Sequence, residues 1–457
     1  MNQASQSTQP ESVNRRDFLK GGSMATLMAL LGGVELRAPA QVRNAAGEII
    51  AGPKVKCGVI GLGGRGRDLI NALNVAADAE LAAVCDHYPA FLRRASNSAP
   101  KAEAVEDYRR VLDNKEIKAV FIATPTHQHK DLVLAALQAG KHVYCEAPLA
   151  STIDDAKAIA KAARAASKQV FQSGLQMRSD PQRHFVLQFI RSGATGRSVL
   201  ARSQWHKKQS WRMASPNPDR EKELNWRLEK GLSLGLIGEV GIHQVDAASW
   251  SLNDLPAAVT GFGGVLHWTD GRSVPDTVQA MFEYPGGGNY VFDGTLANSF
   301  DAEYDVLCGT DAAVMFRGAK AWLFKEVDSP LLGWEVYARK DLFYKETGIA
   351  LVANASKISG NVEGQVEEPP YANTALAHAV EAFLTNCNEV GSAVEDFLST
   401  FANADAAAIK EHLSSLTLQH AAGWREGLDA TIVAIKANEA IMGGKKITFL
   451  KEWFDLA

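Results

Sequence analysis

Three side chains with the spacing of a helix face are the first candidates for chemistry in this sequence. In "GEVGIHQVDAASW", Glu239, His243 and Asp246 stand at positions i, i+4 and i+7, which a continuous helix would bring to one face. Imidazole changes its charge near neutral pH, and a neighbouring carboxylate can orient it or raise its basicity. The pattern suggests a general acid/base, but it also fits a salt-bridged surface face. A Glu/His pair could bind a metal ion, yet the sequence offers no third ligand nearby, so we predict no metal.

A glycine-rich turn is the second feature that could do chemistry. "VIGLGGRG" follows a run of apolar residues and precedes a helical pattern, and Asp86 ends the next apolar run. This order is typical of a dinucleotide-binding turn, in which the phosphates lie against the amides of a helix N-terminus. The predicted cofactor contacts in the turn are Gly61, Gly63, Gly64, Arg65 and Gly66. Asp86 would accept hydrogen bonds from the adenosine ribose and repel a 2′-phosphate, so NAD is favoured over NADP.

The elements around the glycine turn alternate regularly along the first part of the chain. Apolar runs such as "KVKCGVIG", "ELAAVCD" and "AVFIATP" are separated by amphipathic helical patterns such as "HKDLVLAALQAG". Continuous apolar strands between helices predict a doubly wound parallel sheet. We therefore predict an NAD-binding Rossmann domain over residues 54–175 and an α/β fold class.

The remainder of the chain, residues 176–457, follows a different period. Longer strand patterns such as "RSVLARSQWH" and "AVTGFGGVLHW" precede two hairpin patterns, which turn at Pro285–Gly288 and Gly309–Asp311. Helical periodicity returns at "NTALAHAVEAFLTNCN" and "GLDATIVAIKANEAI". These patterns predict a second, α+β domain with a large open antiparallel sheet and C-terminal helices. The stretch 391–423 is predicted to be an insertion or an elaborated helix.

The N-terminal segment is predicted to be a targeting signal rather than part of the fold. "NRRDFLKGGSMATLMALLGGVELRAPA" has paired arginines, a short apolar stretch and a final Ala-x-Ala, so residues 1–40 resemble a twin-arginine signal peptide. An uncleaved membrane anchor is the alternative. Residues 41–53 would form a linker. Export by the twin-arginine translocase implies a periplasmic protein, and because this route carries folded proteins, we expect a tightly bound cofactor that is recycled in place.

Charge and cysteine content narrow the range of partners. A formal net charge of -4 and a pI near 6.3 leave no electrostatic footprint for nucleic acid. The five cysteines have no CxxC spacing. We therefore predict buried free thiols rather than a disulfide framework.

With these residues in place, the chain from Lys54 to about residue 450 resembles the Gfo/Idh/MocA family, named for glucose–fructose oxidoreductase and inositol dehydrogenase. The resemblance is carried by the glycine turn and by "ATPTHQH", "AGKHVYCEAPLA", "SGLQMRSDPQRHFVLQFIRSGATGRSV" and "GLIGEVGIHQVD". It implies an enzyme that transfers a hydride between NAD and a hydroxyl of a sugar, cyclitol or glycoside. It also implies a nicotinamide site between the two domains and a homo-oligomer.

The same resemblance assigns roles to residues beside the nicotinamide. In "TPTHQH", the backbone of Thr124 and Pro125 and the side chain of His129 would flank the cofactor, although His129 could instead be a structural helix cap. Glu146 matches a strand-end glutamate near the nicotinamide ribose. His243 matches the family histidine and would be the general acid/base.

Two carboxylates complete the implied catalytic helix. Glu239 stands where the family more often has aspartate, and it would orient His243. Asp246 matches a family aspartate that could hold the substrate or the helix itself.

One position departs from the family pattern. The lysine that follows the strand-end glutamate in the family is Ala147 here. Proton transfer would then fall to His243 alone, or another group would reach in: His206, Lys207, Lys208 or Arg178. The departure keeps a redox-neutral glycosidase or lyase open, in which transient oxidation permits elimination, water adds, and the hydride returns. A non-catalytic dinucleotide-binding protein is the third alternative.

Candidate substrate-binding residues come from three places in the sequence. Gln176 and Arg178 follow the last Rossmann strand, and the ends of such strands face the ligand cleft. Trp226 and Arg227 in "NWRLEKG" could stack on a sugar and bind its hydroxyls, or they could be a core tryptophan and a surface arginine. His206 in "SQWHKK" is the fifth candidate.

Overall fold

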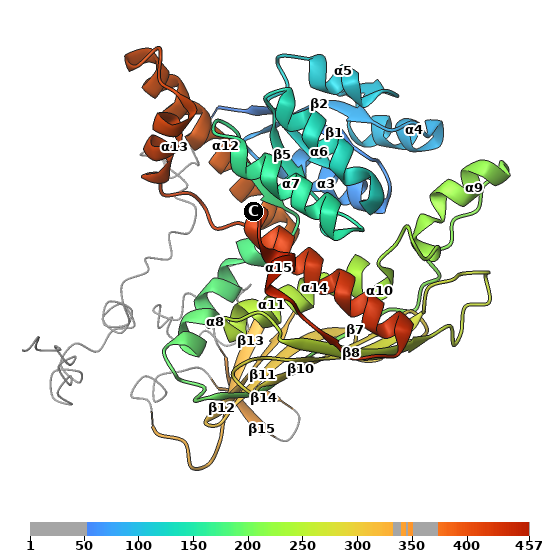
Figure 1. Cartoon of the computed structure of the whole chain (residues 1–457), viewed down its shortest axis with the longest axis vertical. Coiled ribbons are helices and arrows are strands. Elements are labelled where there is room, and N and C mark those ends of the chain that lie inside the picture. Colours follow the sequence, from blue (N-terminus) through green and yellow to red (C-terminus); the bar gives the residue numbers. More distant parts are fainter. Residues whose placement is uncertain (1–52, 332–339, 344–345, 351–372, 457) are drawn as a thin grey trace, which may run out of the picture.

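Six parallel strands form the first sheet, in the order β3-β2-β1-β4-β5-β6 (Figure 1). The computed structural model of the chain describes residues 53–331, 340–343, 346–350 and 373–456. The predicted signal peptide and nearly all of the predicted linker lie outside these residues. The strands are β1 Val55–Ile60, β2 Ala79–Cys85, β3 Glu103–Val105, β4 Ala119–Ile122, β5 His142–Cys145 and β6 Phe171–Ser173. The parallel, doubly wound sheet predicted from the sequence is confirmed.

Helices cover both faces of this sheet, which explains why its central strands are continuous apolar runs. All four residues of β4 are buried. The helices are α3 Gly64–Val75, α4 Pro89–Ser98, α5 Tyr108–Asp113, α6 His129–Gln138 and α7 Ile153–Ala165. The turn between β1 and α3 carries the glycine motif, so the chain places that motif at the carboxyl edge of the sheet.

The second sheet has ten strands, in the order β14-β15-β13-β12-β11-β7-β10-β9-β8-β16. Its strands are β7 Ser198–His206, β8 Ala258–Gly264, β9 Thr277–Glu283, β10 Asn289–Thr295, β11 Glu303–Gly309, β12 Ala312–Arg317, β13 Lys320–Lys325, β14 Lys340–Phe343, β15 Glu346–Ala350 and β16 Ile447–Thr448. Both predicted hairpins, β9–β10 and β11–β12, are confirmed. The sheet is mixed rather than wholly antiparallel, because β7 enters its centre and pairs with β10 in parallel.

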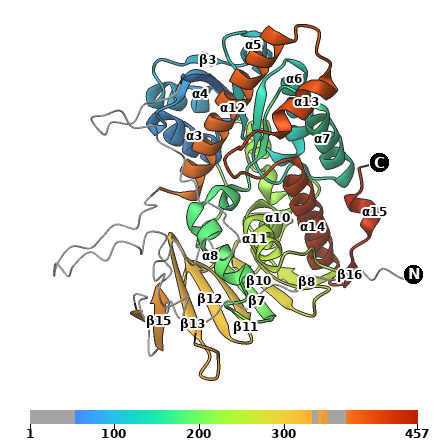
Figure 2. The same cartoon turned by 90° about the vertical axis from the view of Figure 1, so that its left-hand side faces the viewer.

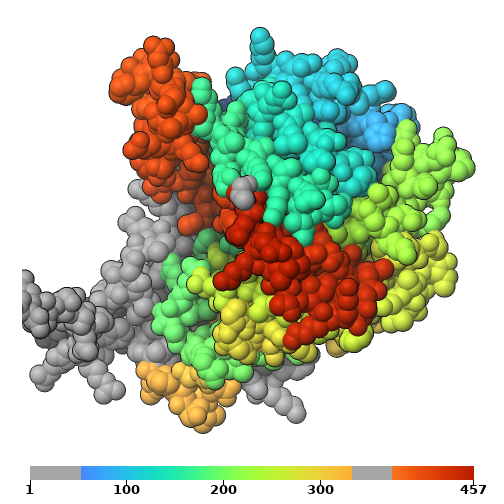
Figure 3. All heavy atoms as spheres, in the orientation of Figure 1, coloured from blue at the N-terminus to red at the C-terminus, as the bar shows by residue number. Residues whose placement is uncertain are grey.

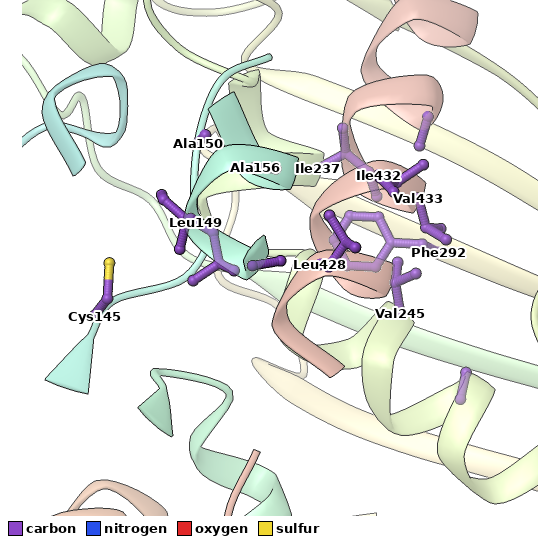
Figure 4. Close-up of a cluster of buried hydrophobic side chains, with 14 of the residues drawn as sticks. Cys145, Leu149, Ala150, Ala156, Ile237, Val245, Phe292, Leu428, Ile432 and Val433 are labelled. Carbon is purple, nitrogen blue, oxygen red and sulfur yellow. The ribbon is translucent and has the colours of Figure 1, made fainter. Parts of the chain in front are cut away.

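Helices cover one face of the second sheet and lie between it and the first domain (Figure 1). They are α8 Pro181–Arg191, α10 Gly235–Glu239, α11 Ile242–Leu252 and α14 Trp424–Gly443. Figure 4 shows Leu149 of the first domain beside Leu428 and Ile432 of α14, with Phe292 of β10 in the same cluster. All four side chains are fully buried, so one apolar core joins the two domains.

The opposite face of the second sheet is open. Along β9, Val278, Ala280 and Phe282 are buried, whereas the alternate residue Met281 is exposed. Phe262 of β8 is also exposed. This alternation is that of a sheet with one covered face, and it agrees with the open sheet predicted from the sequence. None of the described helices is long and apolar enough to cross a lipid bilayer.

The C-terminal helix α12 (Ala375–Thr400) returns to the first domain, where it lies beside α3 (Figure 2). Phe383 packs against Phe121 and Tyr144, with ring centroids 5.1 and 5.7 Å away. The predicted boundary at residue 175 therefore does not divide the fold, because the Rossmann core is completed from near the chain's end. The stretch predicted as an insertion or elaborated helix is the end of α12 followed by α13 (Ala406–Ser414), and Ile409 packs against Val394 there.

Candidate active site

The glycine turn forms a cradle whose shape requires residues without a side chain. Gly61 has φ +94°, and a Cβ there would lie 2.6 Å from the backbone of Ala123 and Thr124. A Cβ on Gly66 would lie 1.9 Å from the carbonyl oxygen of Gly61. Gly63 has no atom within 4 Å of its Cβ position. Glycine is thus required for close backbone packing below the turn, while the space above it is open to a ligand.

Asp86 completes the cradle at the end of β2. Its Oδ2 accepts a hydrogen bond from the amide of Leu62 at 2.8 Å, and its Oδ1 accepts one from the amide of Tyr88, also at 2.8 Å. These bonds fix the carboxylate while each oxygen keeps a lone pair. The residues present therefore fit the adenosine ribose of a dinucleotide.

A cleft of about 880 Å³ extends from this cradle, within the usual range for small-molecule sites. Its first wall contains the glycine turn, Asp86, Thr124 and Pro125. The second wall comes from the other domain, and its lining residues are Trp211, Met213, Arg220, Glu223, Leu224, Trp226 and Arg227. We call residues 211–227 the clasp. It includes α9 (Pro218–Leu224), and η3 (Trp226–Leu228) begins at its end.

The clasp contacts the first domain at the adenosine end of the cleft. The guanidinium of Arg220 lies 5.0 Å from the ring centre of Tyr88, and Nε2 of His87 lies 3.3 Å from Oε2 of Glu223. Figure 3 shows the yellow-green atoms of the clasp against the blue atoms of the first domain. The second domain therefore covers the part of the cleft where the adenosine of a dinucleotide would lie.

The predicted sugar-binding pair lies in the cleft wall. Arg227 stacks over Trp226 and Trp211, at 5.2 and 5.8 Å from the ring centres. His127, which the sequence analysis missed, also lines the cleft and meets Trp226 edge to face at 5.9 Å. Burial lowers the pKa of His127. Its place in "TPTHQH" was the available signal.

His129 lies beneath the cleft rather than on its surface. The side chain is buried, with Nδ1 2.9 Å from the carbonyl oxygen of Pro148 and Nε2 3.0 Å from that of Thr124. Burial lowers its pKa to about 4, so the imidazole is neutral near pH 7 and donates to only one carbonyl at a time. The predicted direct contact with the cofactor is thus replaced by support for the loops on which Thr124 and Pro148 lie.

At the other end of the cleft, Arg65 crosses the carboxyl ends of the strands. Its Nε donates to Oε1 of Glu146 at 2.8 Å, and its Nη2 donates to Oε1 of Gln176 at 2.7 Å. The carboxylate is almost fully buried, and burial raises the pKa of Glu146 although Arg65 opposes the shift. Gly174 makes room for this carboxylate, because a Cβ there would lie 2.6 Å from Oε2 of Glu146. Glu146, a predicted cofactor contact, and Gln176, a predicted substrate contact, are therefore both bound to Arg65.

His243 lies at the start of α11, where the positive charge of Arg65 acts on it. Its Nδ1 is buried and has no hydrogen-bond partner among the residues that the structure describes. Burial, and then the positive charge of Arg65, lower the pKa of His243 to about 3. The imidazole is therefore neutral at physiological pH and can accept a proton. A buried nitrogen without a partner at such a place is typical of a site that a ligand completes.

The continuous helix predicted for the catalytic residues is wrong. α10 ends at Glu239 and α11 begins at Ile242. A Cβ on Gly241, between them, would lie 2.8 Å from both the carbonyl oxygen of Ile237 and the ring of Phe292. The glycine permits the tight packing of this break against the sheet, and spacing along the sequence no longer places the three side chains on one face.

Glu239 is consequently bound to other groups than His243. Its carboxylate accepts hydrogen bonds from the amide of Leu234 and the hydroxyls of Ser233 and Thr126, at 3.2, 3.2 and 3.3 Å. The guanidinium of Arg227 lies 3.8 Å away. Burial raises the pKa of Glu239, and these partners counteract the shift. Glu239 thus joins the clasp to the loop after β4, whereas the sequence predicted that it orients the histidine.

Asp246 and Arg178 form a separate buried pair. Two hydrogen bonds of 2.9 and 2.8 Å join them, and Arg178 stacks over Trp250 at 5.1 Å. Both line a second cavity of about 340 Å³ beside α14 rather than the main cleft. The structure therefore holds them together as a pair that anchors α11 to η2 (Gln176–Ser179).

His206 is also distant from the group around His243. Its Nδ1 lies 3.1 Å from the carbonyl oxygen of Phe300, and its Nε2 lies 3.5 Å from Asp293. The preceding Trp205 packs against the core, and successive side chains of a strand alternate between faces. The predicted substrate contact therefore lies on the open face of the sheet.

The position of the missing lysine is apolar. Ala147 packs against a small cluster that contains Leu175, Ile242 and Ala430. Among the described residues, no group of three or more His, Cys, Asp or Glu side chains is placed to hold a metal ion. All five cysteines lie in the described part of the chain and are free, and four of them are buried, as predicted.

Comparison with known proteins identifies relatives of both domains. Residues 55–173 match the model of an oxidoreductase family with an NAD-binding Rossmann fold, and residues 185–315 match the GFO/IDH/MocA C-terminal domain. Levoglucosan dehydrogenase of Pseudarthrobacter phenanthrenivorans is 32% identical over 155 residues, which are 34% of this chain and 38% of the relative. The chain thus matches less than half the length of this relative.

Two further comparisons bear on the site. The 2,7-anhydro-N-acetylneuraminate hydratase of Escherichia coli is 25% identical over 264 residues, or 57% of this chain and 67% of that protein. A solved structure of levoglucosan dehydrogenase in complex with NADH and levoglucosan has a TM-score of 0.64 at 19% identity, and the match covers 86% of this chain and 99% of that chain. The latter shows that the two chains share a fold.

Proposed function

This chain belongs to the Gfo/Idh/MocA oxidoreductase family, because two models of that family together match more than half of its residues. We propose that the protein transfers a hydride between NAD and a hydroxyl of a sugar, cyclitol or glycoside. The observation that carries the proposal is the place of His243. The charge of Arg65 acts on a neutral imidazole that has an unpartnered nitrogen, and Arg65 itself lines the cleft that contains the dinucleotide cradle. One relative of this chain is named levoglucosan dehydrogenase, a name that indicates oxidation of a sugar derivative.

The residues that would hold the cofactor lie along the cleft. The glycine turn would receive the phosphates and Asp86 the adenosine ribose, while Glu146 would hold Arg65 in place at the nicotinamide end. When bound, NAD supplies a two-electron hydride acceptor. The clasp would exclude water and hold the adenosine end in place.

The chain's own residues would then manage the proton. As the C–H bond of the substrate breaks and its hydrogen leaves with both electrons, the O–H bond breaks and the neutral imidazole of His243 accepts the proton. A carbonyl forms, and the substrate loses the two electrons that the cofactor gains. In the reverse direction His243 returns the proton. Trp226 and Arg227 would bind the sugar at the clasp side of the cleft.

The test is a nucleotide and sugar assay on the purified protein. Any bound nucleotide is released and identified, and the absorbance of reduced nicotinamide is then followed while free sugars and glycosides are added. Persistent reduction of bound NAD by one class of sugar is the expected result. Absence of bound nucleotide, together with no binding of added NAD, would refute the proposal and leave a non-catalytic scaffold protein.

A redox-neutral cycle is the second candidate, and two observations favour it. Ala147 replaces the family lysine in an apolar cluster, and one relative is named as a hydratase rather than a dehydrogenase. In this cycle the oxidised carbon acidifies the neighbouring C–H, the glycosidic bond is eliminated, water adds, and the hydride returns. Release of the aglycone without lasting nicotinamide reduction, and with solvent deuterium in the product, would identify it.

We further propose that the protein is exported in folded form through the twin-arginine translocase and acts in the periplasm, as the sequence of residues 1–40 suggests. Fractionation of cells with and without the Arg15–Arg16 pair tests this, since Lys at both positions should retain the protein in the cytoplasm.

We also propose self-association through the open face of the second sheet, where Phe262 and Met281 are exposed. Light scattering of a Phe262→Lys variant should then show a smaller particle.

A further inference from the structure

Resting on the proposed function, we propose that Arg65 is a catalytic residue, whose guanidinium binds the substrate oxygen as it becomes negative and supplies the positive charge missing at Ala147. The role comes from a residue of the glycine turn rather than from the strand end. It applies equally to net oxidation and to a redox-neutral cycle, because both begin with the same hydride transfer.

The placement of Arg65 supports this role. Its hydrogen bonds to Glu146 and Gln176 hold the side chain across the ends of β5 and β6, where its charge also acts on His243. A guanidinium has five N–H donors. The two bonds use two of them, and even if the nearby hydroxyl of Tyr144 takes a third, two remain for an oxygen in the cleft.

The orientation of the ion pair decides which charge the substrate meets. The side chain of Arg65 is 25% exposed and lines the cleft, whereas that of Glu146 is only 8% exposed. The carboxylate therefore lies behind the guanidinium and fixes it, and the cleft receives the cationic side of the pair. Preorganised donors of this kind stabilise charge that develops during the reaction, because they need no reorganisation.

The neighbouring groups explain why such a charge is needed. His243 is a weak base in this environment, since its pKa is lowered to about 3. Proton transfer is efficient when donor and acceptor are matched, so a weak base requires a more acidic hydroxyl, and a guanidinium at the oxygen would provide it. Arg65 cannot take the proton itself, because guanidinium stays charged in proteins. Charge and proton transfer would thus be divided between two residues.

The experiment compares Arg65→Met, Arg65→Lys and the double variant Arg65→Met/Ala147→Lys with the unaltered protein. The dissociation constant for NAD is measured by titration of nucleotide-free protein, and the rate of nicotinamide reduction is measured in a single turnover at saturating sugar. Arg65→Met should bind NAD within about threefold of the unaltered protein but reduce it ~100-fold more slowly, the scale of one lost oxyanion donor. The single-turnover rate of Arg65→Lys should lie between those of Arg65→Met and the unaltered protein. The double variant Arg65→Met/Ala147→Lys should be at least tenfold faster than Arg65→Met.

Three results would overturn the proposal. A single-turnover rate of Arg65→Met within threefold of the unaltered protein would remove Arg65 from the chemistry while leaving the proposed function intact. A tenfold or greater loss of NAD affinity with an unchanged rate at saturation would make Arg65 a phosphate ligand instead. The third result is that none of the tested sugars reduces NAD bound to the unaltered protein and that no elimination is observed. The proposed function and this inference would then both be refuted.

Discussion

The two ends of the cleft are built on opposite principles. At the adenosine end, backbone geometry does the work: glycines allow close packing, and Asp86 is fixed by two amides. At the nicotinamide end, ion pairs between side chains shape the site, since the buried carboxylates of Glu146 and Glu239 each face an arginine. The first kind of site can be recognised from spacing along the chain, whereas the second depends on partners that the fold brings together. The following substitutions test this division.

The largest effect is expected for His243→Ala, which removes the group proposed to accept the proton. Turnover should fall ~100-fold or more, the usual scale of one acid/base group, while NAD affinity stays unchanged. Steady-state kinetics together with NAD titration would measure both. The matched control is His87→Ala at the adenosine end, which should leave turnover at saturating NAD unaltered. Equal activity of His243→Ala and the unaltered protein would support the non-catalytic alternative.

Gly63→Ala should weaken NAD binding strongly without unfolding the protein. A methyl group there meets no protein atom within 4 Å, so the melting temperature should not change, but it would occupy space that a pyrophosphate needs. We expect the dissociation constant of NAD to rise ~10- to 100-fold, about 1.4–2.7 kcal/mol. Gly286→Ala, at another open position, is the control. Unchanged NAD affinity in Gly63→Ala would place the phosphates elsewhere.

Asp86→Asn should reduce the preference for NAD over NADP by about tenfold. The amide keeps an oxygen for only one of the two backbone donors, and it loses the charge that would repel a 2′-phosphate. Competition binding of the two cofactors measures the ratio. A preference that stays the same would mean that the wall of the clasp, rather than Asp86, excludes the extra phosphate.

The smallest effect is expected at the contact between the clasp and the first domain. Glu223→Gln removes a largely exposed pair with His87, in which both side chains are at least 60% exposed. Because such pairs contribute only ~0–1 kcal/mol, the dissociation rate of NAD should rise less than about fivefold in stopped-flow displacement. A much larger rise would show that charge pairing controls cofactor retention at both ends of the cleft.

The sequence was sufficient for the features that depend on local pattern. Alternating apolar runs predicted the parallel, doubly wound first sheet, and the glycine turn with Asp86 predicted the dinucleotide cradle. The break at Gly241 was not recognised because a glycine is compatible with a helix until its packing against Phe292 is known. Glu146 and Gln176 lie 81 and 111 residues from Arg65, and Thr126 lies 113 residues from Glu239. Hydrophobic periodicity does not predict contacts over such separations. His129 was recognised as important, but only the fold shows that both of its ring nitrogens face backbone carbonyls.

The return of α12 to the first domain has a consequence for how this protein is made. Gln172 on β6 donates a buried hydrogen bond to the carbonyl of Ala379, 207 residues further along the chain, and Phe383 fills the core beside Phe121. A ribosome must therefore synthesise most of the second domain, up to the end of α12, before the core of the first domain can be completed. Until then the nascent chain exposes an incomplete apolar core, which is the kind of surface that chaperones bind. Folding of this chain is consequently expected to be completed after synthesis, and a chain shortened before α12 should fail to hold either domain in its native form.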